Sequence, residues 1–145
     1  MKIIFLDFDG VVNRFDEPES FRKLSPSCVE NLNQLIELSD ANIVISSSWK
    51  GHIPLIPDLA QILVNAGFRF PEKVIGKTPT GPFPCRGREI EEWLKKCRYK
   101  IESFVILDDD SDMEPFLDRL VETDFNVGLT MCDVEKAIVI LNSEE

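Results

Sequence analysis

The 145-residue sequence contains no hydrophobic run long enough to cross a membrane. A membrane-spanning helix needs about 20 consecutive apolar residues, and no stretch approaches that length. The apolar segment at the N-terminus is followed at once by acidic residues and has no small-residue cleavage site, which argues against a signal peptide. We therefore expect a cytoplasmic protein with no membrane partner.

Closely spaced cysteines are also lacking. The four cysteines lie far apart and form no C-x-x-C pair; they are Cys28, Cys85, Cys97 and Cys132. Because structural zinc sites use paired ligands at short spacing, no zinc site is expected. In an intracellular protein we expect these thiols to be reduced and mainly buried as small apolar side chains.

Basic residues are scarce relative to acidic ones. The 16 lysines and arginines stand against 26 aspartates and glutamates, so the net charge is −10. Phosphate contacts need a basic surface, and this balance argues against a protein that only binds nucleic acid, although it leaves room for a local basic pocket. Histidine is limited to His52, and a lone histidine in a loop is usually a surface residue.

Repeats and low-complexity segments are absent, and the composition is that of one globular domain. At 43% hydrophobic residues the chain can bury a core, which predicts a single domain over residues 1–145. The most informative stretch is at residues 2–13. There the apolar run Ile3–Leu6 ends abruptly in Asp7-Phe8-Asp9-Gly10. A short, uniformly apolar run predicts a strand buried on both faces, with Asp7 and Asp9 leaving it on the same side.

Apolar runs alternate with helical patterns along the rest of the chain. Ser25 is expected to cap a helix that Pro26 begins. Residues 14–24 are expected to form a flap and residues 51–85 a short insertion. Further strands are expected at 41–45, 74–75, 103–107 and 125–129, and helices at 58–66, 87–97, 113–121 and after Asp133 as N-cap. This alternation predicts a parallel sheet with helices on both faces.

Polar clusters follow three of the expected strands, and ligands of parallel sheets bind at these carboxyl ends. We therefore expect the clusters to converge on one point. Carboxylates held close together repel each other unless a cation or a proton lies between them; a cation is the simpler answer, and oxygen ligands suit Mg²⁺. The clusters are Asp7 with Asp9, Ser46 with Ser47, and Asp108 and Asp109 with Asp112.

This arrangement can carry out phosphoryl transfer. Asp7 can act as the nucleophile, and Asp9 can give a proton to the leaving group and later take one from water. The Ser46 hydroxyl can hold a phosphoryl oxygen, and Asp108 or Asp109 would complete the metal site. One cation should neutralise the transferring group, and the candidates are Arg86, Arg88, Lys77 and Lys50.

These residues resemble the motifs of a known superfamily. Asp7-Phe8-Asp9-Gly10-Val11 is similar to the D-x-D-G-[TV] signature of haloacid dehalogenase (HAD) phosphohydrolases. Ser46 after a second strand, Arg86-Gly87 at the start of a helix and Leu107-Asp108-Asp109 resemble its other motifs in the same order. Within the superfamily, residues 46–50, 86–94 and 106–113 resemble the HAD domain of Swiss-army-knife RNA repair proteins.

The resemblance implies a three-layer Rossmann-like fold and a Mg²⁺-dependent phosphatase with an aspartyl-phosphate intermediate at Asp7. It also implies acid–base work at Asp9 and metal binding by Asp7, by the backbone carbonyl of Asp9 and by Asp108 or Asp109. Arg86 would neutralise the phosphoryl group where the superfamily more often has lysine. Gly10, Ser47 and Arg88 are expected to contact the substrate.

Neither the flap nor the insertion is large enough to form a cap domain. An open site suits a phosphate on something large, such as a nucleic-acid end or a protein, or else needs a partner domain or subunit as a lid. A small-metabolite phosphatase is an alternative. A receiver-like phospho-acceptor module is another, although its paired acids usually follow the first strand. A third alternative is a degenerate member of the superfamily that binds phosphate or a partner without turnover.

Overall fold

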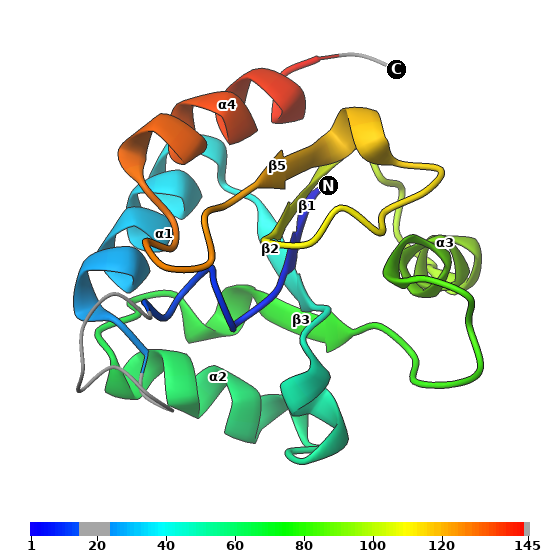
Figure 1. Cartoon of the computed structure of the whole chain (residues 1–145), viewed down its shortest axis with the longest axis horizontal. Coiled ribbons are helices and arrows are strands. Elements are labelled where there is room, and N and C mark those ends of the chain that lie inside the picture. The colour runs from blue at the N-terminus through cyan, green and yellow to red at the C-terminus, as the bar shows by residue number, and fades with distance from the viewer. Residues whose placement is uncertain (15–23, 144–145) are drawn as a thin grey trace.

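The computed structural model describes residues 1–14 and 24–143 and contains a five-stranded parallel sheet with four α-helices (Figure 1). The strand order is β3-β2-β1-β4-β5, and every neighbouring pair is parallel. The strands are β1 (Lys2–Leu6), β2 (Asn42–Ile45), β3 (Val74–Lys77), β4 (Ser103–Asp108) and β5 (Leu120–Glu122). The helices are α1 (Pro26–Ser39), α2 (Ile56–Asn65), α3 (Arg86–Lys96) and α4 (Met131–Leu141).

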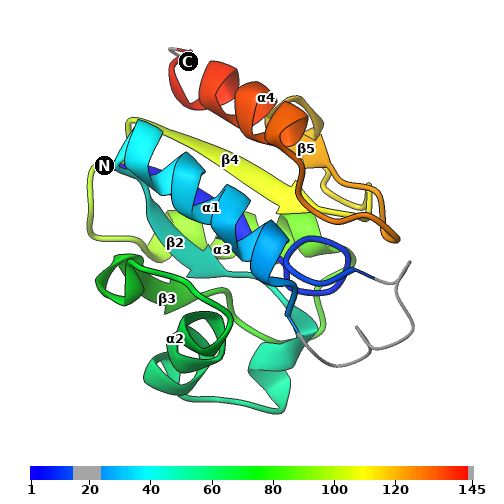
Figure 2. The same ribbon diagram turned by 90° about the vertical axis from the view of Figure 1, so that its left-hand side faces the viewer.

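The helices form two unequal layers around the sheet. Helices α1, α2 and α4 cover one face, where their apolar side chains pack with Ile4, Leu6 and their neighbours in the strands. Among the described helices only α3 covers the other face, where Ile90 packs with Ile3 and Phe5 (Figures 1 and 2). The expected three-layer α/β architecture is therefore confirmed.

The central strand explains why the N-terminal run is apolar throughout. Strand β1 pairs with β2 on one side and β4 on the other, and Ile3 to Leu6 are fully buried. Alternate residues reach opposite faces of the sheet, so both faces need an apolar side chain. The strand ends at Leu6, and Asp9 lies in the turn that follows. We expected Asp7 and Asp9 to leave the strand on the same side. Because Asp9 lies beyond the strand, the alternation of side chains along β1 does not set its direction.

The helix starts follow local capping chemistry. Ser25 caps α1 by accepting the Cys28 N–H, and Pro26 is the first helical residue, as expected. Helix α4 is capped by Thr130, whereas we expected Asp133 in that position. Asp133 is the third helical residue, and it exchanges hydrogen bonds with Thr130 in a capping box.

The expected helix at 113–121 and the expected strand at 125–129 are both wrong. The structure has a short 3₁₀ helix at Leu117–Arg119, strand β5, and a turn in which Asp124 and Gly128 form an isolated bridge. Pro115 interrupts the helical pattern because proline has no N–H to donate. Gly128 has a φ of +76°, which suits a turn rather than a strand.

The cysteines differ from the expectation in their burial. All four cysteines are free, but only Cys28 is buried, so the expectation of mainly buried thiols is wrong.

The expected flap at 14–24 falls largely on residues 15–23, which lie outside the described part of the chain. Among the described residues no segment forms a cap, and residues 51–85 contribute α2 and the edge strand β3 to the domain itself. No described helix has the length and apolar character needed to cross a membrane.

Candidate active site

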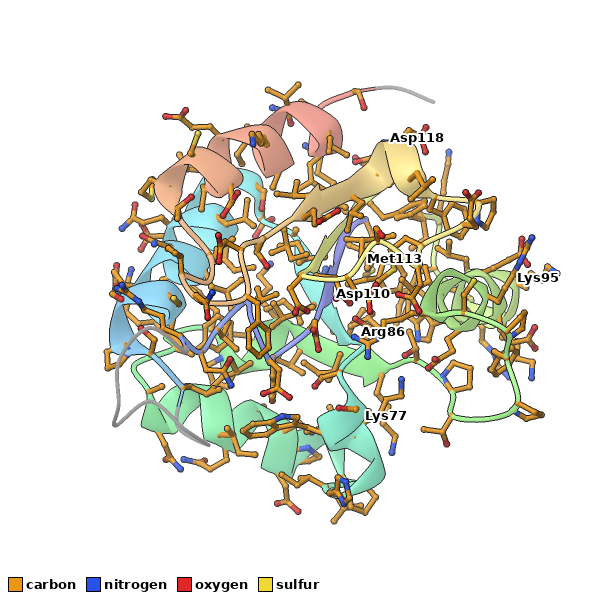
Figure 3. All side chains as sticks on the ribbon, in the orientation of Figure 1. Lys77, Arg86, Lys95, Asp110, Met113 and Asp118 are labelled. Atoms are coloured by element: carbon orange, nitrogen blue, oxygen red, sulfur yellow. The ribbon has the colours of Figure 1, made fainter. Side chains whose placement is uncertain are left out.

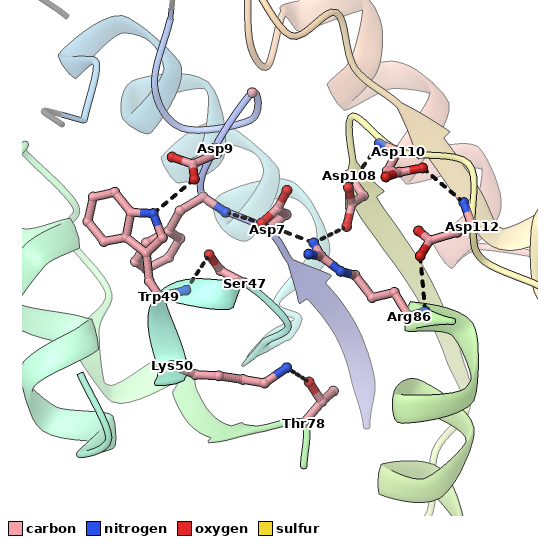
Figure 4. A network of polar contacts seen from close by, with 12 residues as sticks. Asp7, Asp9, Ser47, Trp49, Lys50, Thr78, Arg86, Asp108, Asp110 and Asp112 are labelled. Carbon is pink, nitrogen blue, oxygen red and sulfur yellow. Dashed lines mark hydrogen bonds and ion pairs between the residues drawn. The ribbon is translucent and has the colours of Figure 1, made fainter. Parts of the chain in front are cut away.

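The carboxyl ends of β1, β2 and β4 bring the predicted polar residues together (Figure 4). The pairing of the strands continues one residue beyond their ends. The Asp7 N–H donates to the Leu107 carbonyl at 3.0 Å, and the Ser46 N–H donates to the Leu6 carbonyl at 2.9 Å. Asp7, Ser46 and Asp108 therefore stand on adjacent strands at one edge of the sheet, as the rule for parallel sheets predicts.

Three carboxylates meet at this edge. Each of Asp7, Asp108 and Asp109 offers an oxygen that lies within 4.8 Å of the other two. Asp7 is 4% exposed and Asp108 is fully buried. Gly10 permits the approach of Asp109, because a Cβ at residue 10 would lie 2.8 Å from the Asp109 Cγ, and its φ of +78° also favours glycine.

Arg86, the first residue of α3, reaches two of these carboxylates. Its Nη1 lies 2.8 Å from Asp108 Oδ2 and 3.2 Å from Asp7 Oδ1. The Arg86 N–H donates to the Asp112 carboxylate at 3.2 Å, which ties the start of α3 to the loop after β4. Arg88 faces another way and pairs with Glu91 at 3.2 Å. The structure thus brings Arg86 to the carboxylates and leaves Arg88 apart from them.

Burial and mutual repulsion make these carboxylates difficult to ionise together. Burial, with the charges of Asp108 and Asp109, raises the pKa of Asp7 to about 9, although Arg86 opposes the shift. Burial likewise raises the pKa of Asp108 to about 6 against the opposing effect of Arg86. Burial alone would lower the pKa of Arg86, but the charges of Asp108 and Asp7 outweigh it and raise that pKa.

The carboxylates fit a divalent cation. Three carboxylate oxygens at one point, two of them from buried residues, are the hard donors that Mg²⁺ takes. Both oxygens of Asp108 already have partners, because Oδ2 accepts from Arg86 and Oδ1 accepts the Asp110 N–H at 2.9 Å. Asp109, by contrast, faces Asp7, where it adds to the rise in the pKa of that carboxyl.

The two serines at the end of β2 have different surroundings. Ser47 Oγ accepts the Trp49 N–H at 3.2 Å and so caps the 3₁₀ helix Ser48–Gly51. Ser46 Oγ is buried and has no hydrogen-bond partner among the described residues. A buried hydroxyl without a partner costs about 1–3 kcal/mol, so a ligand oxygen that meets Ser46 would gain a ready donor.

Asp9 lies beside the carboxylate cluster, not within it. Its Oδ2 accepts the indole N–H of Trp49 at 3.1 Å, and its Oδ1 accepts the side-chain amide of Asn13 at 2.8 Å. Trp49 also packs edge-on against Phe8, with ring centroids 5.2 Å apart. The Gly10 N–H, expected to meet the substrate, donates to Asn13 Oδ1 at 2.8 Å.

Lys50 supplies a second cation near the site. It is only 5% exposed, and its Nζ donates to Thr78 Oγ1 at 2.8 Å and to Glu89 Oε1 at 2.7 Å. Burial lowers the pKa of Lys50, while Glu89 opposes that shift. A cavity of about 260 Å³ is lined by Lys50, Arg86, Glu89 and Ser46. Lys77, another candidate cation, instead donates to the Pro54 carbonyl.

Sequence reasoning did not single out Thr78, Glu89 or Asn13. Thr78 directly follows β3, so the rule that placed Asp7 and Ser46 could have found it had β3 been extended to Lys77. Glu89 lies one helical turn after Arg86, and no pattern in the sequence marks it as the partner of Lys50.

Comparison with known families gives one match over most of the chain. A family described as the HAD domain in Swiss Army Knife RNA repair proteins matches residues 3–134. The match includes every residue of the site described above and confirms the resemblance drawn from the motifs. A HAD domain implies phosphohydrolase-type activity. No curated protein and no solved structure gives a significant match.

Proposed function

The chain belongs to the family of HAD domains in Swiss Army Knife RNA repair proteins, and from that premise we propose that it is a Mg²⁺-dependent phosphatase that uses Asp7 as its nucleophile. The observation that carries the proposal is the meeting of three carboxylates, Arg86 and the unpartnered Ser46 hydroxyl at one edge of the sheet.

The metal would be held by Asp7, Asp109 and the backbone carbonyl of Asp9. Asp108 is a further ligand of the same group of carboxylates, since a carboxylate oxygen that accepts one hydrogen bond keeps a second lone pair for a cation. When bound, Mg²⁺ offsets the negative charge of the carboxylates and of the phosphoryl group. Asp108 also holds Arg86 close to Asp7.

The reaction proceeds in two displacements. An Asp7 carboxylate oxygen forms a bond to phosphorus, the ester P–O bond breaks, and the leaving oxygen takes a proton. Water then attacks the phosphorus of the aspartyl phosphate, which releases inorganic phosphate and restores the Asp7 carboxylate. Asp9 is the proposed proton carrier for both steps. That role requires its side chain to exchange its bonds to Trp49 and Asn13 for a bond to the reacting oxygen.

Ser46 and Arg86 would stabilise the charge on the phosphoryl oxygens. The buried Ser46 hydroxyl can donate one hydrogen bond, and Arg86 can add its positive charge. Lys50 lines the same cavity and stays close to it through Thr78 and Glu89. These residues bind and orient the phosphate so that phosphorus faces Asp7.

The substrate is proposed to be a phosphomonoester on a large molecule, such as a nucleic-acid end. Two observations support this class. The described residues include no cap that would enclose a small metabolite, and the family is described from RNA repair proteins. A partner domain or subunit could serve as the lid instead.

The direct test is hydrolysis of a generic aryl phosphate by the purified chain. Asp7→Asn should reduce turnover to background because an amide cannot attack phosphorus, and chelation by EDTA should stop the reaction until Mg²⁺ is restored. Asp118→Asn is the matched control, since Asp118 is exposed and lies far from Arg86 (Figure 3). Undiminished turnover by Asp7→Asn, or full activity in EDTA, would refute the proposal. A stable phosphorylated Asp7 without release of phosphate would indicate a phospho-acceptor module instead.

A further inference from the structure

Strand β3 and helix α3 border a groove that starts at the catalytic edge. Strand β3 is an edge strand, and in the described part of the chain α3 is the one helix on its face of the sheet. Val74 is buried toward α2, whereas Ile75 packs only in part on the α3 side and Lys77 is half-buried. The Trp93 indole lies close over Gly76, so a Cβ there would be 3.3 Å from its Nε1. The single helix thus leaves the β3 side of this face partly open.

Three adjoining cavities make up this groove. The first, about 260 Å³, lies at Ser46 and Arg86. The second, about 410 Å³, shares Lys50 and Thr80 with the first. The third, about 460 Å³, shares Trp93 and Lys96 with the second. The shared lining residues join the candidate active site to the C-terminal end of α3.

The lining of the three cavities holds more basic than acidic residues, and at their catalytic end Arg86 pairs with Asp7 and Asp108. The chain has 16 basic and 26 acidic residues, but the groove is lined by five basic and two acidic ones. The acidic residues are Glu89 and Glu92, which pair with Lys50 and Lys96. The Lys96 side chain is 76% exposed, and a pair so open to solvent is weak, so an anion can replace Glu92. The basic residues are Lys50, Lys77, Arg86, Lys96 and Arg98.

Aromatic side chains lie along the same groove. Trp93 forms part of its wall and packs edge-on against Phe5, with ring centroids 5.5 Å apart. Tyr99 lines the far cavity and is 56% exposed. A line of cations with an exposed aromatic ring is the combination by which proteins bind single-stranded nucleic acid, because phosphates meet the cations and a base stacks on the ring.

We propose that this groove binds the single-stranded nucleic acid that carries the phosphate removed at Asp7. The inference rests on the proposed phosphatase function and adds a path for the substrate. From Arg86 to Lys96 the helix rises about 15 Å at 1.5 Å per residue. At roughly 3.4 Å per stacked nucleotide, the groove takes about four nucleotides. The terminal phosphate lies at the carboxylates, and the strand leads from it past Lys50 and Lys96 to Tyr99.

Adjacent lysines on α3 provide a matched pair of variants. Lys96 lines the groove, whereas Lys95 does not and points away from the core (Figure 3). Each forms an i,i+4 pair, Lys96 with Glu92 at 3.0 Å and Lys95 with Glu91 at 3.8 Å. Both side chains are largely exposed, so Lys96→Ala and Lys95→Ala should fold equally well, and their melting temperatures should agree.

The first measurement is binding of fluorescein-labelled eight-nucleotide oligo-U and oligo-dT, each with a 3′- or a 5′-phosphate. In EDTA, where turnover is blocked, Lys96→Ala should weaken binding about three- to tenfold and reduce the salt slope by about one. Tyr99→Ala should weaken it about fivefold or more. Lys95→Ala should bind like the unmodified chain. Equal affinities of the Lys95 and Lys96 variants would overturn the proposal that the groove binds nucleic acid.

The second measurement is the KM of the unmodified chain for phosphorylated oligonucleotides of one to eight nucleotides. KM should fall up to about four nucleotides and then stay level. A KM that does not depend on length, with a small phosphate ester as the best substrate, would overturn the inference while the phosphatase stands. The chain could instead bind oligonucleotides in a way that depends on Lys96 and yet hydrolyse no phosphomonoester. That result would overturn the proposed phosphatase function and leave the groove proposal standing.

Discussion

Arg86 contacts both Asp7 and Asp108 through one nitrogen atom, and its position depends on α3 beginning where it does. Arg88 is two residues further along the same helix and faces Glu91. Because residues two apart on a helix face different directions, only one of the two can reach the carboxylates from this helix. The sequence contained both arginines and left the choice open, since the direction in which α3 docks is a tertiary property.

The contrast between the two arginines gives a test at the scale of single residues. Arg86→Ala should lower kcat for an aryl phosphate about 100-fold or more, because the site loses a preorganised positive charge beside the transferring group. Arg88→Ala should change kcat less than about twofold, since its pair with Glu91 is a surface contact. Steady-state kinetics in saturating Mg²⁺ measures kcat for both variants. A larger loss in Arg88→Ala than in Arg86→Ala would show that Arg88 neutralises the phosphoryl group.

The polar residues at strand ends could be located from sequence because the rule needs only the ends of apolar runs. Asp7, Ser46 and Asp108 each follow such a run directly. The rule could not separate Ser46 from Ser47. One hydroxyl is buried without a partner and the other caps a 3₁₀ helix, and that difference depends on how the chain turns after β2.

At the scale of secondary-structure elements, the docking of α3 against the loop after β4 positions Arg86. Gly87 lets the start of α3 lie close to the loop after β4, because a Cβ at that position would lie only 2.2 Å from the Glu114 carbonyl oxygen. The Gly87 N–H donates to the Asp112 carbonyl at 3.1 Å. A larger residue would push the start of the helix, and Arg86 with it, away from the carboxylates.

Gly87→Ala is therefore expected to destabilise the fold by about 1–3 kcal/mol, despite the better helix propensity of alanine. It should also lower kcat, since Arg86 moves with the helix start. Gly51→Ala is the matched control, because nothing lies within 4 Å of a Cβ at that position. Urea unfolding of the two variants measures the difference in free energy. A Gly87→Ala variant as stable and active as Gly51→Ala would contradict this view of α3.

The long apolar runs were predicted correctly as strands, whereas the secondary structure between β4 and α4 was predicted wrongly. Strands β1 and β4 are buried on both faces, and that alone explains their composition. Strand β5 has only three residues and gains its stability from pairing with β4 rather than from its own pattern. Its short length left no periodicity to detect.

At the scale of the whole molecule, the carboxylate cluster links stability to pH and to Mg²⁺. The pKa of Asp7 is raised to about 9 and that of Asp108 to about 6 in the folded state. A group with a raised pKa stabilises the fold while it is protonated, and that contribution is lost as the pH rises from its unfolded pKa through its folded one. The metal-free protein should therefore lose stability as the pH rises from about 4 toward 9.

Thermal unfolding in EDTA should show a melting temperature that falls between pH 5 and pH 8.5. Mg²⁺ at about 100 times its Kd should add about 2.7 kcal/mol, or roughly 5–10 °C, and the gain should be larger at pH 8 than at pH 5 because the ion competes with protons for the carboxylates. Asp7→Asn should flatten the pH dependence in EDTA. A melting temperature that rises with pH in EDTA would contradict the assignment of the cluster.

The groove beside α3 could not be predicted from sequence, although the overall charge left room for a local basic pocket. Its cations come from positions 50, 77, 86, 96 and 98, on several different elements, and no run of basic residues announces them. The fold brings them to the lining of three adjoining cavities, of which the first borders the carboxylate cluster. A net charge describes solubility and long-range attraction, but it does not describe a single surface.

The place of β1 in the middle of the sheet has a consequence for biosynthesis. Strand β1 is made before α1, β2 and α3, yet its partner β4 at Ser103–Asp108 is made only after α3. Until then one side of the most apolar strand has no neighbour, and Asp7 is separated from Asp108 and Asp109. A nascent chain that stops before β4 thus lacks one of the two neighbours of its central strand, and we expect it to need chaperone protection until β4 emerges.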